Sequence, residues 1–174
     1  MEQLPELLPD SALEIHTARL SQLPLLRTHA ATLFPILSAA ELYEFTGGSP
    51  PETVEALSEV YGSRQSRRSP DGNQLWLNWL VRVTKGGHGI GYTQATVHPT
   101  HAYVAWVIGT QWQGLGYASE SAAGLVQMLG RLGVAEIRAC VHPSHKASRR
   151  VAEKAGLCLI NDRVDGEEVW AMRV

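Results

Sequence analysis

A glycine-rich segment in the second half of the chain joins an alternating apolar run to a helical pattern. The apolar run covers residues 103–108, and Gln-Trp-Gln-Gly-Leu-Gly follows at 111–116. Beyond it, small and apolar residues recur at steps of four and three: Ala118, Ala122, Leu125, Leu129 and Leu132. The order predicts a strand, a glycine loop and a helix of about 17 residues. Because the first turn of a helix presents free N–H groups and a partial positive charge, this junction is a candidate phosphate site.

The segments before the loop predict helices followed by a strand meander. Residues 20–25 form an apolar run typical of a strand, 27–37 show helical spacing, and 39–45 could add another turn or two. A further helix is expected to begin at Pro51, where the missing N–H costs nothing. Three strands joined by short turns then complete an antiparallel meander; they are expected at 74–84, 90–97 and 101–108.

The segments after the loop predict a second alternation of strand and helix. A strand is expected at 135–141, and Ser144 is a candidate cap for the next helix. Two strands, 157–163 and 167–174, flank Asp165-Gly166, a strong hairpin signal. A helix between the strands at 101–108 and 135–141 makes that pair a parallel crossover. The sequence therefore predicts a mixed α/β domain with one parallel connection at the glycine loop.

Composition narrows the class of protein. The chain has 174 residues and a formal net charge of −2, which predicts one domain over 1–174 and no nucleic-acid partner. We expect residues 1–12 to form a loose tail, and no apolar run approaches the ~20 residues of a membrane span. With no basic, apolar leader, the expected location is the cytoplasm. Cys140 and Cys158 lack metal-ligand spacing, and we expect both to be buried free thiols in strands.

The loop itself distinguishes between three phosphate-binding chemistries. A nucleotide-binding P-loop ends in Gly-Lys-Ser/Thr, but here Gly116 is followed by Tyr117 and Ala118. A dinucleotide fingerprint needs a third glycine where this chain has Ser119, and an acidic residue at the end of the next strand, where it has Val141-His142. A nicotinamide-dependent enzyme is thus a weak alternative. The third chemistry is a Gln-x-x-Gly-x-Gly loop, which is present at 111–116.

That loop, with Tyr-Ala-Ser-Glu at 117–120, resembles the acetyl-CoA loop of the GNAT N-acetyltransferases, and most closely their ribosomal-protein-acetyltransferase-like (RimJ/RimL) branch. The resemblance continues in 145–157 (His-Lys-Ala-Ser-Arg-Arg-Val-Ala-Glu-Lys-Ala-Gly-Leu) and in Thr-Ala-Arg-Leu at 17–20, and covers 13–174. It implies the GNAT fold: a mostly antiparallel sheet of about 6–7 strands with helices on both faces. It also implies acetyl-CoA as cosubstrate, an amine acceptor, no metal and no membrane partner.

The resemblance implies which residues bind the cofactor. Main-chain N–H groups from Gln113 to Ala118 would hold the pyrophosphate. The main chain of the preceding strand, at 106–108, would pair with the pantetheine arm while its side chains lie in the core. His145 stands where the branch usually has Asn. The full expected set is Trp106, Val107, Ile108, Gln111, Gln113, Gly114, Leu115, Gly116, Tyr117, Ala118, His145 and Ser148.

Catalytic residues are harder to assign. Ser148 is a candidate donor of the proton that the CoA thiolate needs, and a contact to CoA without acid chemistry is the alternative role. Many relatives use a tyrosine four residues further on, but this chain has Ala152. The strand at 101–108 lacks the glutamate that serves many relatives as base. His101 and Tyr103 are weak candidates, Glu41 and Glu44 are others, and positioning of a neutral amine needs no base. His142, at the end of the strand expected at 135–141, is expected to point towards the same region as His145.

Three tryptophans leave a structural and a functional interpretation open. Trp76, Trp79 and Trp112 could pack in the core or form an aromatic wall for the acceptor. The acceptor itself, and whether the chain is a monomer or a homodimer, do not follow from the sequence. A non-catalytic GNAT-fold module that binds an acyl-CoA is the alternative function.

Overall fold

The computed structural model describes residues 3–174 and is built on eight strands and five α-helices. The strands are β1 (Ile15–His16), β2 (Leu20–Pro24), β3 (Leu75–Val83), β4 (Gly89–Val97), β5 (Ala102–Ile108), β6 (Glu136–Val141), β7 (Cys158–Val164) and β8 (Glu167–Arg173). The helices are α1 (Asp10–Leu13), α2 (Ala30–Leu37), α3 (Val54–Arg64), α4 (Tyr117–Arg131) and α5 (Lys146–Lys154). Short 3₁₀ turns lie at η1 (Arg27–His29), η2 (Ala40–Tyr43) and η3 (Thr110–Trp112).

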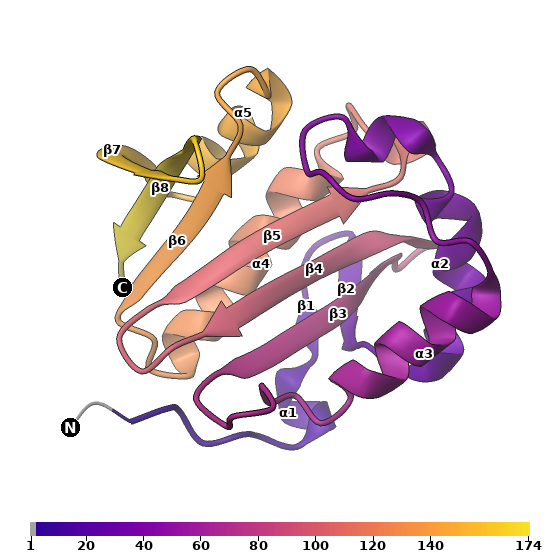
Figure 1. Cartoon of the computed structure of the whole chain (residues 1–174), viewed down its shortest axis with the longest axis horizontal. Coiled ribbons are helices and arrows are strands. Elements are labelled where there is room, and N and C mark those ends of the chain that lie inside the picture. Colours follow the sequence, from indigo (N-terminus) through magenta and orange to yellow (C-terminus); the bar gives the residue numbers. More distant parts are fainter. Residues whose placement is uncertain (1–2) are drawn as a thin grey trace.

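The strands form one sheet in the order β1-β2-β3-β4-β5-β6-β8-β7 (Figure 1). Every neighbouring pair is antiparallel except β5 and β6, which confirms the mixed α/β class and its single parallel connection. The sheet has eight strands where the sequence predicted about 6–7. The additional strand is the two-residue β1, which is too short for an alternation pattern to predict.

Side chains that alternate along the strands pack against helices on both faces of the sheet. Leu77 and Trp79 of β3 lie in the core cluster that contains α4 and α5. Leu80, on the opposite face, packs with α2 and α3, and Tyr92 of β4 packs against the same cluster. Because successive side chains of a strand point to opposite faces, this alternation gives the sheet two apolar surfaces. Helices therefore cover both faces, as predicted.

The one parallel pair opens into a gap. β5 and β6 are paired at Ala102–Ile137 and Tyr103–Arg138, close to the first residues of both strands. Beyond Tyr103 the two strands diverge towards their carboxyl ends (Figure 1), and the glycine loop follows β5 on that side. The rest of β5 consequently has a hydrogen-bonding edge that β6 does not cover.

Two helix starts differ from the sequence prediction. Helix α3 begins at Val54 and not at Pro51, because the hydroxyl of Thr53 accepts a hydrogen bond from the Ala56 N–H at 3.0 Å and so caps the helix. Helix α5 begins at Lys146, and its N-cap position is occupied by His145 without a side-chain cap bond. The predicted cap by Ser144 was therefore wrong by one residue.

The cysteines and the first residues also depart from expectation. Cys158 is exposed and Cys140 only half-buried, so burial was wrong for Cys158, although both lie in strands. The reason is position, since β7 is the last strand of the sheet and all its residues are exposed. Of the tail expected at 1–12, residues 1–2 lie outside the described residues, whereas Leu4 and Leu7 pack against the main core and α1 begins at Asp10. No helix within 3–174 has the length and apolarity that crossing a membrane requires.

Candidate active site

The glycine loop has the backbone geometry that its sequence predicted. Gly114 and Gly116 adopt positive φ angles of 76° and 84°, a region that L-residues with a Cβ rarely occupy. Gly116 is also the N-cap of α4, a helix of 15 residues. The loop therefore turns directly into the first turn of α4, where free N–H groups and the positive end of the helix dipole coincide.

Arg19, at the start of the sheet, holds this loop in place. Its Nη1 donates to the Leu115 carbonyl oxygen at 3.0 Å, and its Nε donates to the Glu120 carboxylate at 2.6 Å. The guanidinium also lies 4.6 Å from the centre of the Tyr117 ring. Thr17 donates to the same carboxylate at 2.6 Å. The Thr-Ala-Arg-Leu segment noted in the sequence thus fixes the loop and the first turn of α4.

A cavity of about 260 Å³ lies between this loop, the end of β5 and helix α5. We call it the glycine-loop cavity. It brings together nine of the twelve predicted cofactor residues, from β5, the glycine loop, the start of α4 and the region of α5. The nine that line it are Trp106, Ile108, Gln113, Gly114, Gly116, Tyr117, Ala118, His145 and Ser148. Leu115 is exposed, Gln111 is exposed on η3, and Val107 faces the other side of the sheet.

The glycine-loop cavity also contains polar groups that the sequence did not single out. The indole N–H of Trp112 is buried and has no hydrogen-bond partner within the described chain. Arg150 and Lys154, four residues apart on α5, place two cations on its wall. Their i, i+4 spacing is visible in the sequence, but it becomes meaningful only once α5 is placed beside the loop. Unpaired donors and cations together suit a polyanionic ligand.

The free edge of β5 complements this cavity. The Gly109 N–H donates to the Ile90 carbonyl at 2.8 Å, so alternation turns the main-chain groups of Val107 towards β4. By the same alternation, the main-chain N–H and carbonyl groups of Trp106 and Ile108 point to the gap beside β6. The Ile108 carbonyl accepts a hydrogen bond from the Gln113 side chain at 2.9 Å. The side chains of Trp106 and Val107 are only half-buried, so the expected core position holds for Ile108 alone of residues 106–108.

Ser148 and His145 belong to the wall of the cavity that α5 and the segment before it form. Both line the glycine-loop cavity, and both are partly buried. The His145 ring stacks on Phe45 with ring centres 4.5 Å apart. Burial lowers the pKa of His145 and outweighs the opposing effect of Glu44, so the imidazole is neutral near pH 7. Ala152 is completely buried, which leaves no room there for the tyrosine of other relatives.

A second cavity, of about 490 Å³, lies on the opposite face of the sheet along β4 and β5. We call it the central cavity; it is lined by Tyr43, Tyr92, Tyr103, Trp106, Val107 and Glu167 among others. Trp106 lines both this cavity and the glycine-loop cavity, so the two meet at the gap between β5 and β6. Glu167, on β8, gives this cavity a carboxylate that no sequence signal indicated.

The candidate bases are separated by the fold. Tyr103 lines the central cavity, whereas His101 precedes β5 and stacks on His98 with ring centres 4.6 Å apart. Five residues of strand separate His101 from Trp106, about 17 Å. Burial, and then the neighbouring His98 and Arg138, lowers the pKa of His101. Because a base must reach its proton within hydrogen-bond distance, the structure does not bring His101 to the site.

The other candidates from the sequence are placed as follows. Glu44 lies close enough to His145 to influence its pKa, and His142 lies beside Phe45 with ring centres 5.3 Å apart. Glu41 is exposed and lines none of the cavities described here. Thus η2 and the segment after it reach the mouth of the gap, although Glu41 itself points to solvent.

The three tryptophans have different roles. Trp79 is 1% exposed and its indole N–H donates to the Leu13 carbonyl at 2.8 Å, so it is a core residue. Trp76 is half-buried and donates to the Gln74 side chain at 2.8 Å on β3, away from the glycine loop. Trp112 lines the glycine-loop cavity. None of them lines the central cavity, so within 3–174 they do not form an acceptor wall there.

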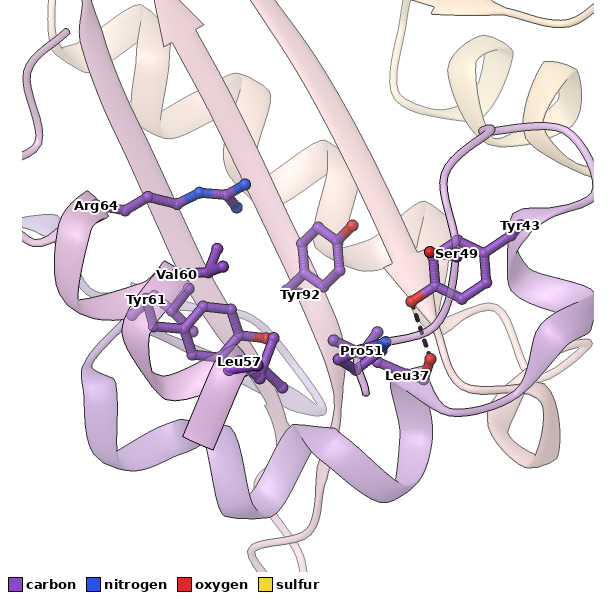
Figure 2. Close-up of a pocket in the computed structure, with 11 residues that line it drawn as sticks. Leu37, Tyr43, Ser49, Pro51, Leu57, Val60, Tyr61, Arg64 and Tyr92 are labelled. Carbon is purple, nitrogen blue, oxygen red and sulfur yellow. Dashed lines mark hydrogen bonds between the residues drawn. The ribbon is translucent and has the colours of Figure 1, made fainter. Parts of the chain in front are cut away.

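A third cavity, of about 270 Å³, continues from the central cavity towards α2 and α3. We call it the tyrosine cavity, after Tyr43, Tyr61 and Tyr92, which line it together with Arg64 (Figure 2). Tyr43 and Tyr92 line both this and the central cavity. No sequence motif indicates this cavity, because its residues are spread over η2, α3 and β4 among other elements.

Known structures share this architecture. An acetyltransferase of the GNAT family from Bacillus anthracis superposes with a TM-score of 0.73 at 17% identity, over 92% of this chain and 98% of that one. Aminoglycoside acetyltransferase AAC(6')-Ib in complex with coenzyme A gives 0.71 at 18% identity, over 88% and 94%. Mycobacterium smegmatis RimJ in complex with CoA-disulfide gives 0.71 at 18% identity, over 88% and 81%.

Sequence comparison gives the family. No curated protein matches the chain by sequence. The model of the acetyltransferase (GNAT) domain family, however, matches residues 19–157, a stretch that contains the glycine loop, both diverging strands and α5. With the GNAT fold and the glycine-loop cavity already described, this match shows that the chain belongs to the GNAT acetyltransferase family.

Proposed function

We propose that this protein transfers the acetyl group of acetyl-CoA to a primary amine by direct attack on the thioester. The observation that carries the proposal is the meeting of two cavities at Trp106, one beside the glycine loop and one on the opposite face of the sheet. A donor and an acceptor could then approach from opposite faces through the gap between β5 and β6. The similar structures of AAC(6')-Ib and RimJ, solved with coenzyme A and CoA-disulfide, support a CoA ligand here.

The glycine-loop cavity fits the donor. Main-chain N–H groups of residues 113–118 would bind the pyrophosphate, because Gly114 and Gly116 leave space for close approach. The cations of Arg150 and Lys154 and the unpartnered indole N–H of Trp112 add donors for phosphate or amide oxygens. The main-chain groups of Trp106 and the N–H of Ile108, which face the gap, would pair with the amide groups of the pantetheine arm, whereas the Ile108 carbonyl already accepts from Gln113.

The edge of β5 that faces the gap would also stabilise the intermediate of acetyl transfer. As the amine attacks, a C–N bond forms and the carbonyl oxygen becomes negatively charged, and a β5 main-chain N–H facing the gap would stabilise that charge. The C–S bond then breaks, and the sulfur takes a proton. Ser148 is the proposed proton donor because it lines the cavity on the side of α5.

Deprotonation of the amine is proposed to rest mainly on positioning. Within the described chain β5 carries no carboxylate, and the central cavity offers Tyr103 and Glu167. An amine that binds in its neutral form needs a base only after attack, when its second proton is acidic enough for a water-linked group to accept it.

We also propose that the chain belongs to the RimJ/RimL-like branch of the family, because of the sequence motifs at 111–120 and 145–157.

One alternative remains, because the structure also agrees with a module that binds an acyl-CoA without turnover. The observation that favours it is Ala152 in place of the tyrosine, together with the absence of an acidic residue in β5. Calorimetric titration with acetyl-CoA, followed by measurement of thiol release with a panel of primary amines, separates the two. Micromolar binding with amine-dependent thiol release supports the transferase, binding without release supports the module, and no binding contradicts both.

A further inference from the structure

The tyrosine cavity is apolar in most of its wall but contains one buried polar group without a partner. Leu25, Leu37 and Leu57 form its floor. Tyr61 is 4% exposed, and its hydroxyl has no hydrogen-bond partner within residues 3–174. Burial strongly raises the pKa of this phenol, so it remains protonated and can donate. A buried donor without an acceptor is costly, so a ligand oxygen that enters the cavity and accepts from this hydroxyl would be stabilised.

The lining of the cavity also includes a cation, the guanidinium of Arg64. Arg64, in the last turn of α3, reaches across towards Tyr92 (Figure 2). Other arginines nearby are paired, Arg67 with Asp10 and Arg27 with Glu59. No ion pair of Arg64 is found in the described part of the chain, and its cavity has no acidic residue in its lining there. The electrostatic character of the cavity is therefore positive.

This cavity is continuous with the proposed site of acetyl transfer. Tyr43 and Tyr92 line both the tyrosine cavity and the central cavity. Tyr92 on β4 is the cross-strand partner of Val107 on β5, one residue from Trp106 at the gap. A ligand that spans Tyr92 would place one end at the gap and the other end beside Arg64 and Tyr61.

We propose that the acceptor is an amine with an apolar body that carries a carboxylate at the end remote from the amine. The apolar body would lie on the leucine floor, the carboxylate would bind Arg64, and the hydroxyl of Tyr61 would donate to an oxygen of the ligand. This inference rests on the proposed transferase function and adds the class of its substrate. Polycationic acceptors are disfavoured, because their charges would face an unpaired guanidinium without an acidic counterpart in this cavity.

The test compares acids with their amides. The probes are Gly-Phe, β-alanyl-Phe and 4-aminobutyryl-Phe, each with its C-terminal amide, and spermidine as the polycation. They place an amine and a carboxylate at increasing separation around one aromatic body. Initial rates of thiol release at saturating acetyl-CoA are measured for the unaltered chain, for Arg64→Gln and for Tyr61→Phe. The control is Arg68→Gln, which removes the same charge from an exposed side chain outside the cavity.

We expect at least one acid to be preferred over its amide, measured as kcat/KM. Arg64→Gln should lower kcat/KM for that acid about 10- to 100-fold by raising KM, and leave its amide nearly unchanged, as loss of a charged hydrogen bond predicts. Tyr61→Phe should raise KM by about 3- to 10-fold. Arg68→Gln should change neither, and spermidine should be poor in all variants.

The possible failures are distinguishable. If acetyl-CoA binds and amines are acetylated, but acids and amides react equally or Arg64→Gln has no selective effect, the substrate class is wrong and the transferase stands. If no amine is acetylated, the proposed function fails. In that case titration of the CoA-bound protein with the three acids and their amides still decides the site: Arg64-dependent binding of an acid supports it, and equal or undetectable binding overturns it.

Discussion

The glycine-loop cavity and the tyrosine cavity, which lie at opposite ends of the proposed site, are built from different parts of the chain. The glycine-loop cavity depends on main-chain groups, and its side chains serve mainly to fix them, as Arg19 does through Leu115 and Glu120. The tyrosine cavity depends on side chains from separate elements. Among them, the Tyr61 hydroxyl has no hydrogen-bond partner and Arg64 no ion pair within residues 3–174. The comparison indicates that a main-chain site can bind one constant ligand, whereas a side-chain site can change its specificity by single substitutions.

The largest expected effect comes from β4, which supports both cavities. A Cβ atom on Gly91 would overlap the Val107 carbonyl oxygen on β5. Gly91→Ala should therefore separate the two strands and lower the free energy of unfolding by at least about 3 kcal/mol in urea titration. Gly130→Ala is the control, since the new methyl group would meet only the side chain of the terminal Val174. Equal stability of the two variants would contradict this packing.

A substitution in the glycine loop should weaken ligand binding in the glycine-loop cavity and leave binding in the tyrosine cavity unchanged. Gly116→Val places a β-branched residue at a φ of 84°, so the loop must move and its N–H groups lose their direction. CoA affinity should fall about 30-fold or more by calorimetry, while Arg64-dependent binding of the acid remains. Gly133→Val, at a φ of 82° beyond the end of α4, carries the same strain away from the cavity and should leave CoA affinity unchanged. Loss of affinity in both variants would point to general destabilisation.

Ser148→Ala tests chemistry within the glycine-loop cavity. If the hydroxyl donates the proton to the leaving thiolate, kcat should fall about 10²-fold with little change in CoA affinity. Ser144→Ala, exposed and outside the cavity, is the matched control. A change in CoA affinity at constant kcat would show that Ser148 only contacts the cofactor.

The smallest effect concerns the support of the glycine loop at acidic pH. Burial tends to raise the pKa of Glu120, but hydrogen bonds from Thr17 and Arg19 together hold it below its usual value. The folded state therefore loses this stabilisation as the pH falls below the unfolded pKa, about 4.3, and through the folded pKa. Glu120→Gln should flatten the decline in stability below pH 5. The difference should be at most about 1 kcal/mol, because the pair is partly exposed. A steeper decline in the variant would contradict the assignment.

The glycine loop could be predicted from the sequence, whereas the tyrosine cavity could not. Gly114 and Gly116 must be glycines for backbone reasons, so the loop, the helix after it and the parallel crossover were predictable from local pattern. Arg64 and Tyr61 obey no local constraint, because they become neighbours only when α3 packs over β4. The distance between His101 and the gap has a related cause, because His101 precedes β5 and lies at the opposite end of that strand from the gap.

A two-dimensional amide NMR titration of the protein with CoA tests most directly whether the glycine loop binds the donor. We expect the largest shifts at the main-chain amides of residues 113–118, at Trp106 and Ile108, and at the indole N–H of Trp112. Residues of the tyrosine cavity such as Tyr61 and Arg64 should shift little. Shifts concentrated around the tyrosine cavity, with the loop amides unchanged, would contradict the assignment of the donor site to the glycine loop.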